Sequence, residues 1–576
     1  MSLIRFSFRR HPFLRLIQHF CLRAAGANSS ADLDLGLGGA LALLAVPGAF
    51  TTILLMDKYS PLLQWLRGLP HFNPYLACLS DEHFFLVYSM AVTGLITSLR
   101  WDELLPAGRD FANFAPLPLS LSRIFLANVV ALAASAALFA VDINLVSALV
   151  FPVLVSGAAV SGANSNLAAF WEFFVAHAFA VLGISAFTFL ALIALQGVLM
   201  AALPGWLYRR AALLLRTALL ILFVGALLSV FLPLPFQPLN HVSARTFEWW
   251  PPLWFLSWFE SHIGALQNRS PLGPGPVWQA LGGALLLAIA GFWLSYRRYF
   301  LRIPEQQSGP SPSSGTTGLV FRSVFAGFRL LLHPGLETAC FHFTVQTLLR
   351  SETHLLLAGL WAGVGLLLTL QGLQSSTTTA GLALTPALLS APLTFVLLSL
   401  GGLRFIFDLP SSAHANWPFR LLAAEGSRQV RAACRKLLLV MGLIPLLLVW
   451  FPLALRQAGF RPAVSYLLFH LLILALAVEL LLWKFQKVPF TCSFIPQRDR
   501  LLKIAFGSVI ILFVLLPMLA RIEAIAAAQP LVLALFLLSL LGTFVWLARH
   551  GPSDSQSLLY EDRSLESFAW LRLGKD

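Results

Sequence analysis

Long apolar runs alternate with short polar segments along the whole chain. A membrane-spanning helix needs about 20 mostly apolar residues to cross roughly 30 Å of hydrocarbon. Twelve runs are of about this length, at 36–56, 83–99, 124–145, 168–203, 211–233, 278–296, 354–373, 383–402, 437–455, 464–483, 504–522 and 529–547. The pattern predicts an all-α, polytopic membrane protein with about 12 transmembrane helices.

The composition supports this prediction, and the absence of enzyme motifs narrows the classes of function to consider. Hydrophobic residues make up 58% of the chain and charged residues only 11%, a balance that is not typical of soluble domains. The sequence contains no GxxxxGKS/T phosphate loop and no HExxH, CxxC or GxSxG motif. We therefore expect a protein that is not an enzyme, with no metal site and no cofactor in this chain.

The placement of the 39 Lys and Arg residues predicts the orientation of the chain. Most of them lie before the first run or in every second segment after it, and cytoplasmic loops carry such an excess of positive charge. We therefore expect both termini in the cytoplasm and the chain in the inner (plasma) membrane. The stretch 142–167 is interpreted as an outer loop partly embedded in the interface, because a further crossing there would invert every later basic loop.

The formal net charge of +14 invites comparison with nucleic-acid-binding proteins. Cytoplasmic basic residues next to membrane helices bind anionic lipid headgroups, and this placement accounts for nearly all of the excess charge. Membrane lipid, and not nucleic acid, is therefore the expected partner of these residues.

The runs divide into two six-helix halves around a polar connector. The predicted parts are a cytoplasmic amphipathic segment at 1–34, a first six-helix unit at 35–298 with an outer segment at 234–277, a cytoplasmic linker and amphipathic stretch at 299–352, a second six-helix unit at 353–548, and a cytoplasmic tail at 549–576. The outer segment is rich in Trp and Pro, and we expect a short helix at 253–265 that lies in the membrane interface or forms an outer gate.

Two cytoplasmic loops repeat the same order of short motifs, which favours a duplicated six-helix unit. The motifs are Leu105-Pro106, Ala112-Asn113-Phe114 and Ser122-Arg123 in the first loop, and Leu409-Pro410, Ala415-Asn416-Trp417 and Ser427-Arg428 in the second. The two halves also carry a histidine at similar depth, His177 in the first and His470 in the second.

Few ionisable residues fall inside the runs, and intramembrane charge is costly enough to suggest a function. The candidates for a transport pathway are His177, His470 and Glu479. A neutral imidazole can also be satisfied by one backbone carbonyl between packed helices, and Glu479 can pair with Lys484. The five cysteines form no CxxC pair, so we expect no disulfide framework and treat all five as inert.

The segment 100–123 carries the most informative polar sequence. It combines charged residues, a short apolar run and a Pro-Leu-Pro-Leu-Ser string that leads directly into the third run. The residues that carry this pattern are Asp102, Glu103, Leu105, Pro106, Arg109, Asp110, Pro116, Leu117, Pro118 and Ser120. In this segment, in the amphipathic N-terminal stretch and in the outer segment 234–277, the chain resembles the membrane (permease) subunits of type-2 ABC exporters, in a fused or duplicated form.

The resemblance implies that the segment 100–123 is a coupling helix that docks into a groove on a separate ATPase subunit. It further implies two copies of that ATPase, with ATP bound on the partner, and an accessory or second permease subunit. The second coupling loop would lie at 403–436, with Asp408, Pro410, Trp417 and Arg428, although it lacks the Pro-Leu-Pro-Leu-Ser string. An apolar pathway suits amphiphilic or lipid-like cargo that is exported.

Two other classes of function stay open at this point. A twelve-helix secondary transporter would use polar residues at the middle of the membrane, but the Gly-rich motif of that class is missing after the second run. The other class is a membrane assembly protein without transport activity or a lipid-modifying enzyme. An enzyme needs paired acidic or His groups at one membrane face, and Glu248, Glu260 and His262 form only a loose cluster.

Overall fold

The computed structural model is predominantly helical in the part of the chain that it describes. This part comprises residues 12–24, 37–67, 73–104, 120–159, 167–231, 249–263, 273–298, 332–377, 386–411, 427–483, 485, 487–491 and 516–549. No strand occurs in these ranges. A helix satisfies its own backbone hydrogen bonds, which is why chains this apolar fold as helices in lipid.

Nine helices in the described ranges are long and apolar enough to cross a membrane, and they coincide with nine of the predicted runs. They are α5 (Pro74–Leu99), α7 (Leu121–Ala159), α8 (Leu167–Ala202), α9 (Gly205–Phe231), α11 (Gly275–Arg298), α15 (Glu352–Thr377), α16 (Pro386–Phe407), the continuous set α18 (Ser427–Pro445), η6 (Leu446–Trp450) and α19 (Phe451–Ala458), and α20 (Phe460–Leu481). The chain is therefore a polytopic helical protein of the membrane type.

The three remaining runs are described in part. The run at 36–56 forms α3 (Leu37–Tyr59), and the run at 529–547 forms α23 (Pro530–Arg549). Most of the run at 504–522 lies outside the described residues, and α22 (Leu516–Ala528) contains its end. The number of twelve transmembrane helices thus stays a prediction.

The chain divides into two compact units, Met1–Ser311 and Pro312–Asp576. The first unit contains α3, α5, α7, α8, α9 and α11 together with the shorter elements α2 (Pro12–Ala24), α4 (Pro61–Leu66), η1 (Trp101–Glu103) and α10 (Pro251–His262). The short helix α10 is the one predicted at 253–265. It packs against α5, α8 and α11, and these contacts hold α10 on the helical bundle.

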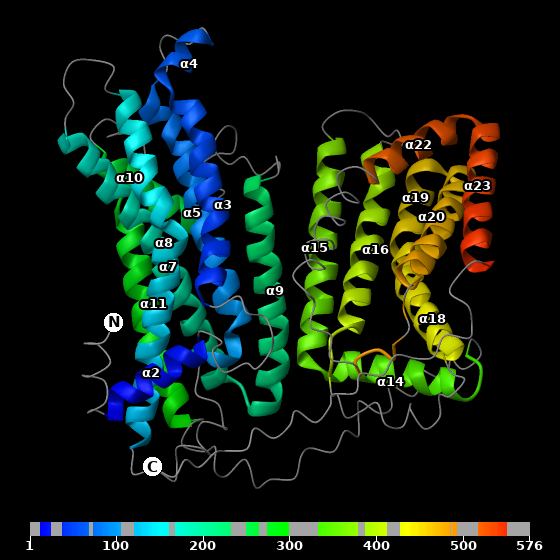
Figure 1. Ribbon diagram of the computed structural model, residues 1–576, viewed down its shortest axis with the longest axis horizontal. Coiled ribbons are helices and arrows are strands. Elements are labelled where there is room, and N and C mark those ends of the chain that lie inside the picture. The colour runs from blue at the N-terminus through cyan, green and yellow to red at the C-terminus, as the bar shows by residue number, and fades with distance from the viewer. Residues whose placement is uncertain are drawn as a thin grey trace, which may run out of the picture. The chain divides into compact units, whose positions relative to one another are not determined.

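The second unit repeats much of the packing of the first. Its elements are α14 (Leu336–Arg350), α15, α16, α18, η6, α19, α20, α22 and α23. The amphipathic α2 packs on α7, and α14 packs on α18, so each unit begins with a helix seated on its third long helix. Figure 1 shows α14 lying across, rather than along, the ends of α15 and α16.

The correspondence extends through the bundle of long helices. The pairs α5–α7, α5–α8, α5–α9, α7–α8 and α8–α11 of the first unit match α16–α18, α16–α20, α16–α22, α18–α20 and α20–α23 of the second. The first long helix differs, since α3 packs mainly on α7 whereas α15 packs mainly on α16. The repeated pairs support the duplication inferred from the loop motifs.

The helix α7 continues beyond the point where the sequence pattern ended it. The predicted run stops at residue 145, but α7 extends over 39 residues to Ala159, which is about 58 Å at 1.5 Å per residue. The expected outer loop at 142–167 is therefore helical as far as Ala159. Asn144 is accommodated because its amide donates to the Ala140 carbonyl at 2.8 Å and its oxygen accepts from Ser89 at 2.5 Å.

The backbones of helices α8 and α11 come close together at two glycines, Gly197 and Gly291. A methyl group added at Gly197 would lie 2.8 Å from the backbone Cα and carbonyl carbon of Gly291. The Ser295 hydroxyl also donates to the Gly197 carbonyl at 3.2 Å. Small residues permit such close backbone contact between membrane helices.

Gly197→Ala is therefore expected to destabilise the first unit by about 1–3 kcal/mol, because backbone cannot yield as a side chain can. The matched control is Gly282→Ala on α11, where an added methyl group meets nothing within 4 Å. Alanine has the higher helix propensity, so the control should be neutral or slightly stabilising. Unfolding of the two variants in mild detergent measures the difference, and equal midpoints would contradict the close contact.

Candidate functional site: anchored helix ends and buried charge pairs

The end of α5 is fixed by an arginine from α9. The Arg216 guanidinium donates to the backbone carbonyls of Ser98 at 2.9 Å and Leu99 at 2.7 Å, and to the Asp102 carboxylate at 2.7 Å. The last carbonyls of a helix have no partner within the helix and carry partial negative charge. Arg216 therefore caps α5 and ties the residues that follow it to α9.

The residues after α5 are also seated on α8. The Gln196 side-chain amide of α8 donates to the Trp101 carbonyl at 2.9 Å. The side chains of Trp101 and Leu104 are each 2% exposed, and they belong to one cluster with Ile193 of α8 and Ala212 of α9. The start of the segment 100–123, directly after α5, is thus held by α8 and α9.

The predicted coupling residues divide between described and undescribed positions. Asp102 is exposed except for its ion pair with Arg216, Glu103 ends the short helix η1, and Ser120 is exposed just before α7. The other predicted residues of this segment lie outside the described residues: Leu105, Pro106, Arg109, Asp110, Pro116, Leu117 and Pro118.

The second unit anchors the end of α16 in a comparable way. The Arg404 guanidinium pairs with Asp408 at 2.8 Å and donates to the Leu481 carbonyl at the end of α20 at 3.0 Å. His354 Nε2 lies 3.1 Å from the Leu409 carbonyl. Asp408 is thus part of a fixed helix end, and Pro410 and Arg428 are exposed on either side of the undescribed stretch 412–426, which includes Trp417.

The segment after α20 joins this second anchor through its backbone. The Phe490 amide donates to the Phe407 carbonyl at 3.1 Å, and the Ser411 amide donates to the Phe490 carbonyl at 2.9 Å. Phe490 has a φ of 65°, a left-handed backbone conformation that is energetically unfavourable for phenylalanine. Its 1% exposed ring packs against His354 and Phe407, and this burial helps to hold the conformation.

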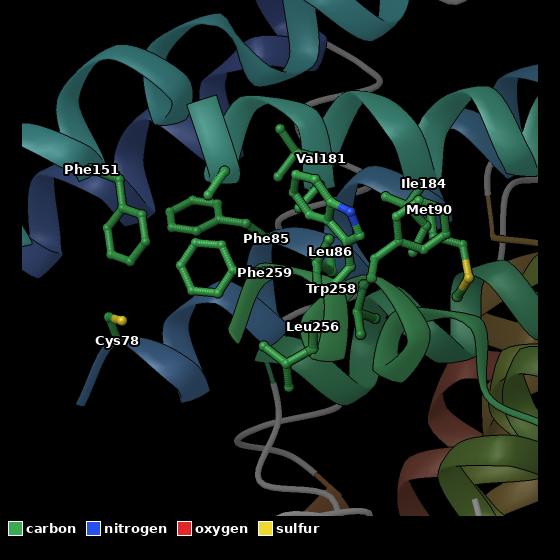
Figure 2. Packing of buried hydrophobic residues seen from close by; sticks show 14 of the residues in the cluster. Cys78, Phe85, Leu86, Met90, Phe151, Val181, Ile184, Leu256, Trp258 and Phe259 are labelled. Atoms are coloured by element: carbon green, nitrogen blue, oxygen red, sulfur yellow. The ribbon is translucent and has the colours of Figure 1, made fainter. Parts of the chain in front are cut away.

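A fully buried contact between a carboxyl group and an imidazole lies inside the first unit. His177 Nδ1 on α8 lies 2.6 Å from Glu82 Oε2 on α5, and both side chains are 0% exposed. The rings of Phe85 and Phe151 lie 5.5 and 5.2 Å from the imidazole ring. Figure 2 shows Phe85, Phe151 and Phe259 gathered in this core.

The direct partner of His177 was not predicted from the sequence. Glu82 precedes the apolar run predicted at 83–99, so it lies outside every run of the sequence pattern. In the structure α5 begins at Pro74, and this earlier start places Glu82 two turns inside the helix. A buried carboxylate without a partner is very costly, so the contact with His177 is the main compensation for burying Glu82.

A second charge cluster lies next to Glu82 toward the end of α3. The Lys58 ammonium group pairs with the Asp81 carboxylate at 2.7 Å, and the Tyr59 hydroxyl donates to the same carboxylate at 2.5 Å. Lys58 and Asp81 are partly exposed, with 33% and 13% of their side-chain surface accessible. The polar groups of the first unit thus extend from a partly exposed pair to a buried one.

The corresponding histidine of the second unit has a different environment. His470 Nδ1 lies 2.8 Å from the Tyr466 carbonyl of its own helix, the backbone interaction expected for a packed imidazole. The nearest carboxylate is Glu523 of α22, at 3.6 Å from Nδ1. The structure therefore places a carboxylate near both predicted histidines, but from different helices and with direct contact only in the first unit.

Glu479, the third candidate for the pathway, makes a contact between helices. Its carboxylate pairs with the Arg435 guanidinium of α18 at 2.6 Å and lies 3.7 Å from Arg431. Lys484, the partner expected from the sequence, lies outside the described residues. The ion pair gives Glu479 a structural role between α18 and α20, and its place in a pathway stays a prediction.

These contacts provide two kinds of site. The first is a helix end that is bonded to neighbouring helices, and the second is the buried Glu82–His177 pair, a polar centre within an apolar bundle. Comparison with known proteins does not assign either site, because no protein-family model, no curated protein and no solved structure matches this chain.

Proposed function

We propose that this chain is the permease component of an ATP-driven transporter of the type-2 ABC exporter kind. In this proposal the chain crosses the plasma membrane twelve times, with both termini in the cytoplasm. Two copies of a separate ATPase, which bind the ATP, engage the segments 100–123 and 403–436. The cargo is amphiphilic or lipid-like and is exported.

One observation carries the proposal: the first residues of the segment 100–123 are bonded to the long helices of the first unit. A coupling element has to pass movement of the ATPase to the membrane helices. Arg216 and Gln196 link the first residues of this segment to α9 and α8, and Asp102 follows α5 by three residues. A push on the segment would therefore move α5, α8 and α9 together.

The second unit supports the proposal in a weaker form. Contacts of Arg404, His354 and the Phe490 backbone hold the end of α16. The loop at 403–436 therefore also begins at a helix end that is bonded to its neighbours. Most pairs of packed helices in one unit have a counterpart in the other, so movement of both anchored helix ends would act on equivalent helices. A single copy of this chain would then supply both halves of a translocator.

Site-specific crosslinking tests the proposal. A photo-crosslinking amino acid at Asp110, in the coupling segment, is expected to capture an ATPase subunit that carries a phosphate loop in cells that express the full-length chain. The control position is Arg269 in the predicted outer segment, which should capture no such subunit. Capture from Arg269 but not from Asp110 would overturn both the coupling role and the predicted orientation.

A further inference from the structure

The connection that follows α20 in the second unit is much longer than its counterpart in the first. Only Leu203 and Pro204 join α8 to α9, whereas residues 482–515 separate α20 from α22. Within this longer connection, the segment 487–491 returns to the end of α16. The short link between α8 and α9 leaves no room for an equivalent segment in the first unit.

The segment 487–491 is bonded to the end of α16 through its backbone. The Phe490 amide donates to the Phe407 carbonyl at 3.1 Å, and the Phe490 carbonyl accepts from the Ser411 amide at 2.9 Å. Within the segment, the Thr491 hydroxyl donates to the Val488 carbonyl at 2.9 Å and closes a tight turn. Because Ser411 belongs to the loop at 403–436, these bonds restrain the beginning of that loop as well as the end of α16.

Burial holds this segment in place against an unfavourable backbone conformation. Val488 and Phe490 are each 1% exposed, and they belong to the same apolar cluster as Phe407. The φ of 65° at Phe490 opposes the bound form, because the β-carbon of an L-residue is crowded in the left-handed region. A segment that is held by such contacts, and not by a helix of its own, opens more readily than the helices around it.

We propose that the segment 487–491 is a releasable clasp on the end of α16. When closed, the clasp fixes the beginning of the loop at 403–436 through its bonds to Phe407 and Ser411. When open, it frees that loop while the helices stay folded. A partner that binds only the freed loop selects the open state, and its apparent affinity is reduced by the fraction of molecules that are closed. The clasp is thus an autoinhibitory contact of the second unit.

The partner concerned is the ATPase, and this step rests on the proposed function. In the first unit the ATPase meets the segment 100–123 directly, but in the second unit it has to open the clasp before it can engage the loop at 403–436. The two sites of one chain then bind the ATPase in sequence, the first unit before the second.

Hydrogen exchange of the purified full-length chain tests the clasp without any partner. The Phe490 and Ser411 amides lose their bonds in the same opening, so both should report one free energy of opening. This value should be smaller than that of the amides in the middle of α16 and α20. Exchange as slow as in the middle of these helices would make the segment a permanent part of the core and overturn the proposal, as would unrelated values for the two amides.

Two variants at one position separate the packing of the clasp from its backbone strain. Phe490→Ala removes the buried ring, so exchange of the Ser411 amide should accelerate by more than about 100-fold. Phe490→Gly removes the same ring but tolerates the left-handed conformation, and its exchange should be about fivefold slower than that of Phe490→Ala. Phe460→Ala, at a 69% exposed ring on α20, is the control and should leave the Ser411 amide unchanged. Equal exchange in the Ala and Gly variants would contradict the strained closed form.

Photo-crosslinking distinguishes a failure of the clasp from a failure of the proposed function. With the crosslinking amino acid at Trp417, in the second loop, capture of the ATPase should increase in Phe490→Ala, whereas capture from Asp110 should not change. Normal capture from Asp110 without an increase at Trp417 would overturn the autoinhibitory role. No capture from Asp110 would instead count against the proposed function, and hydrogen exchange would still decide whether the clasp opens.

Discussion

Replacement of residues 105–119 by a Gly/Ser segment of equal length is expected to abolish association with the ATPase while the chain still inserts into the membrane. The replaced stretch contains the first four residues of the Pro-Leu-Pro-Leu-Ser string, and the replacement leaves the buried Trp101 and Leu104 in place. Loss of the central contact of an interface lowers affinity by more than about 100-fold, since a few residues carry most of the binding free energy. Co-purification of the ATPase with the tagged chain measures the loss.

A second variant separates docking from transmission. Arg216→Gln keeps the segment 100–123 but removes the guanidinium that ties Asp102 and the end of α5 to α9. We expect this variant to retain the ATPase and to lose the dependence of ATP hydrolysis on the cargo. If the 105–119 replacement still co-purifies with the ATPase at the wild-type level, the segment is not the docking element.

The sequence predicted the positions of the long helices because their apolar runs are clear. It predicted less about where each helix ends. α7 runs on through Asp142 and Asn144, because a polar side chain in a helix can bond to the carbonyl four residues earlier or to a neighbouring helix, as Asn144 does with Ala140 and Ser89. Periodicity alone contains no information about these partners.

The buried contacts were predictable only in part. His177 and His470 stood out because ionisable residues are rare within apolar runs, but the partner of His177 did not. Glu82 lies beyond the edge of its run and is buried because α5 begins eight residues before it, at Pro74, and packs on α8.

The buried pair of the first unit provides the second large expected effect. His177→Phe removes the imidazole and leaves the Glu82 carboxylate fully buried with no partner, which should destabilise the protein by about 3–5 kcal/mol. Glu82→Leu leaves a neutral imidazole in the same place, and the cost should be smaller, since a neutral group is less expensive to bury than a charge.

The double variant Glu82→Leu/His177→Phe distinguishes a true pair from two independent buried residues. Replacement of both groups by apolar side chains removes the uncompensated charge, so the double variant should be more stable than His177→Phe alone, with an interaction free energy of about 2–3 kcal/mol in the cycle. Unfolding in detergent gives the four stabilities, and Glu172→Gln, an exposed carboxylate on the same helix as His177, serves as the control. Simple addition of the two single effects would mean that Glu82 and His177 are not energetically coupled. Strong coupling with unchanged transport would assign the pair to the stability of the bundle, whereas strong coupling with transport lost in Glu82→Leu would place it in the pathway.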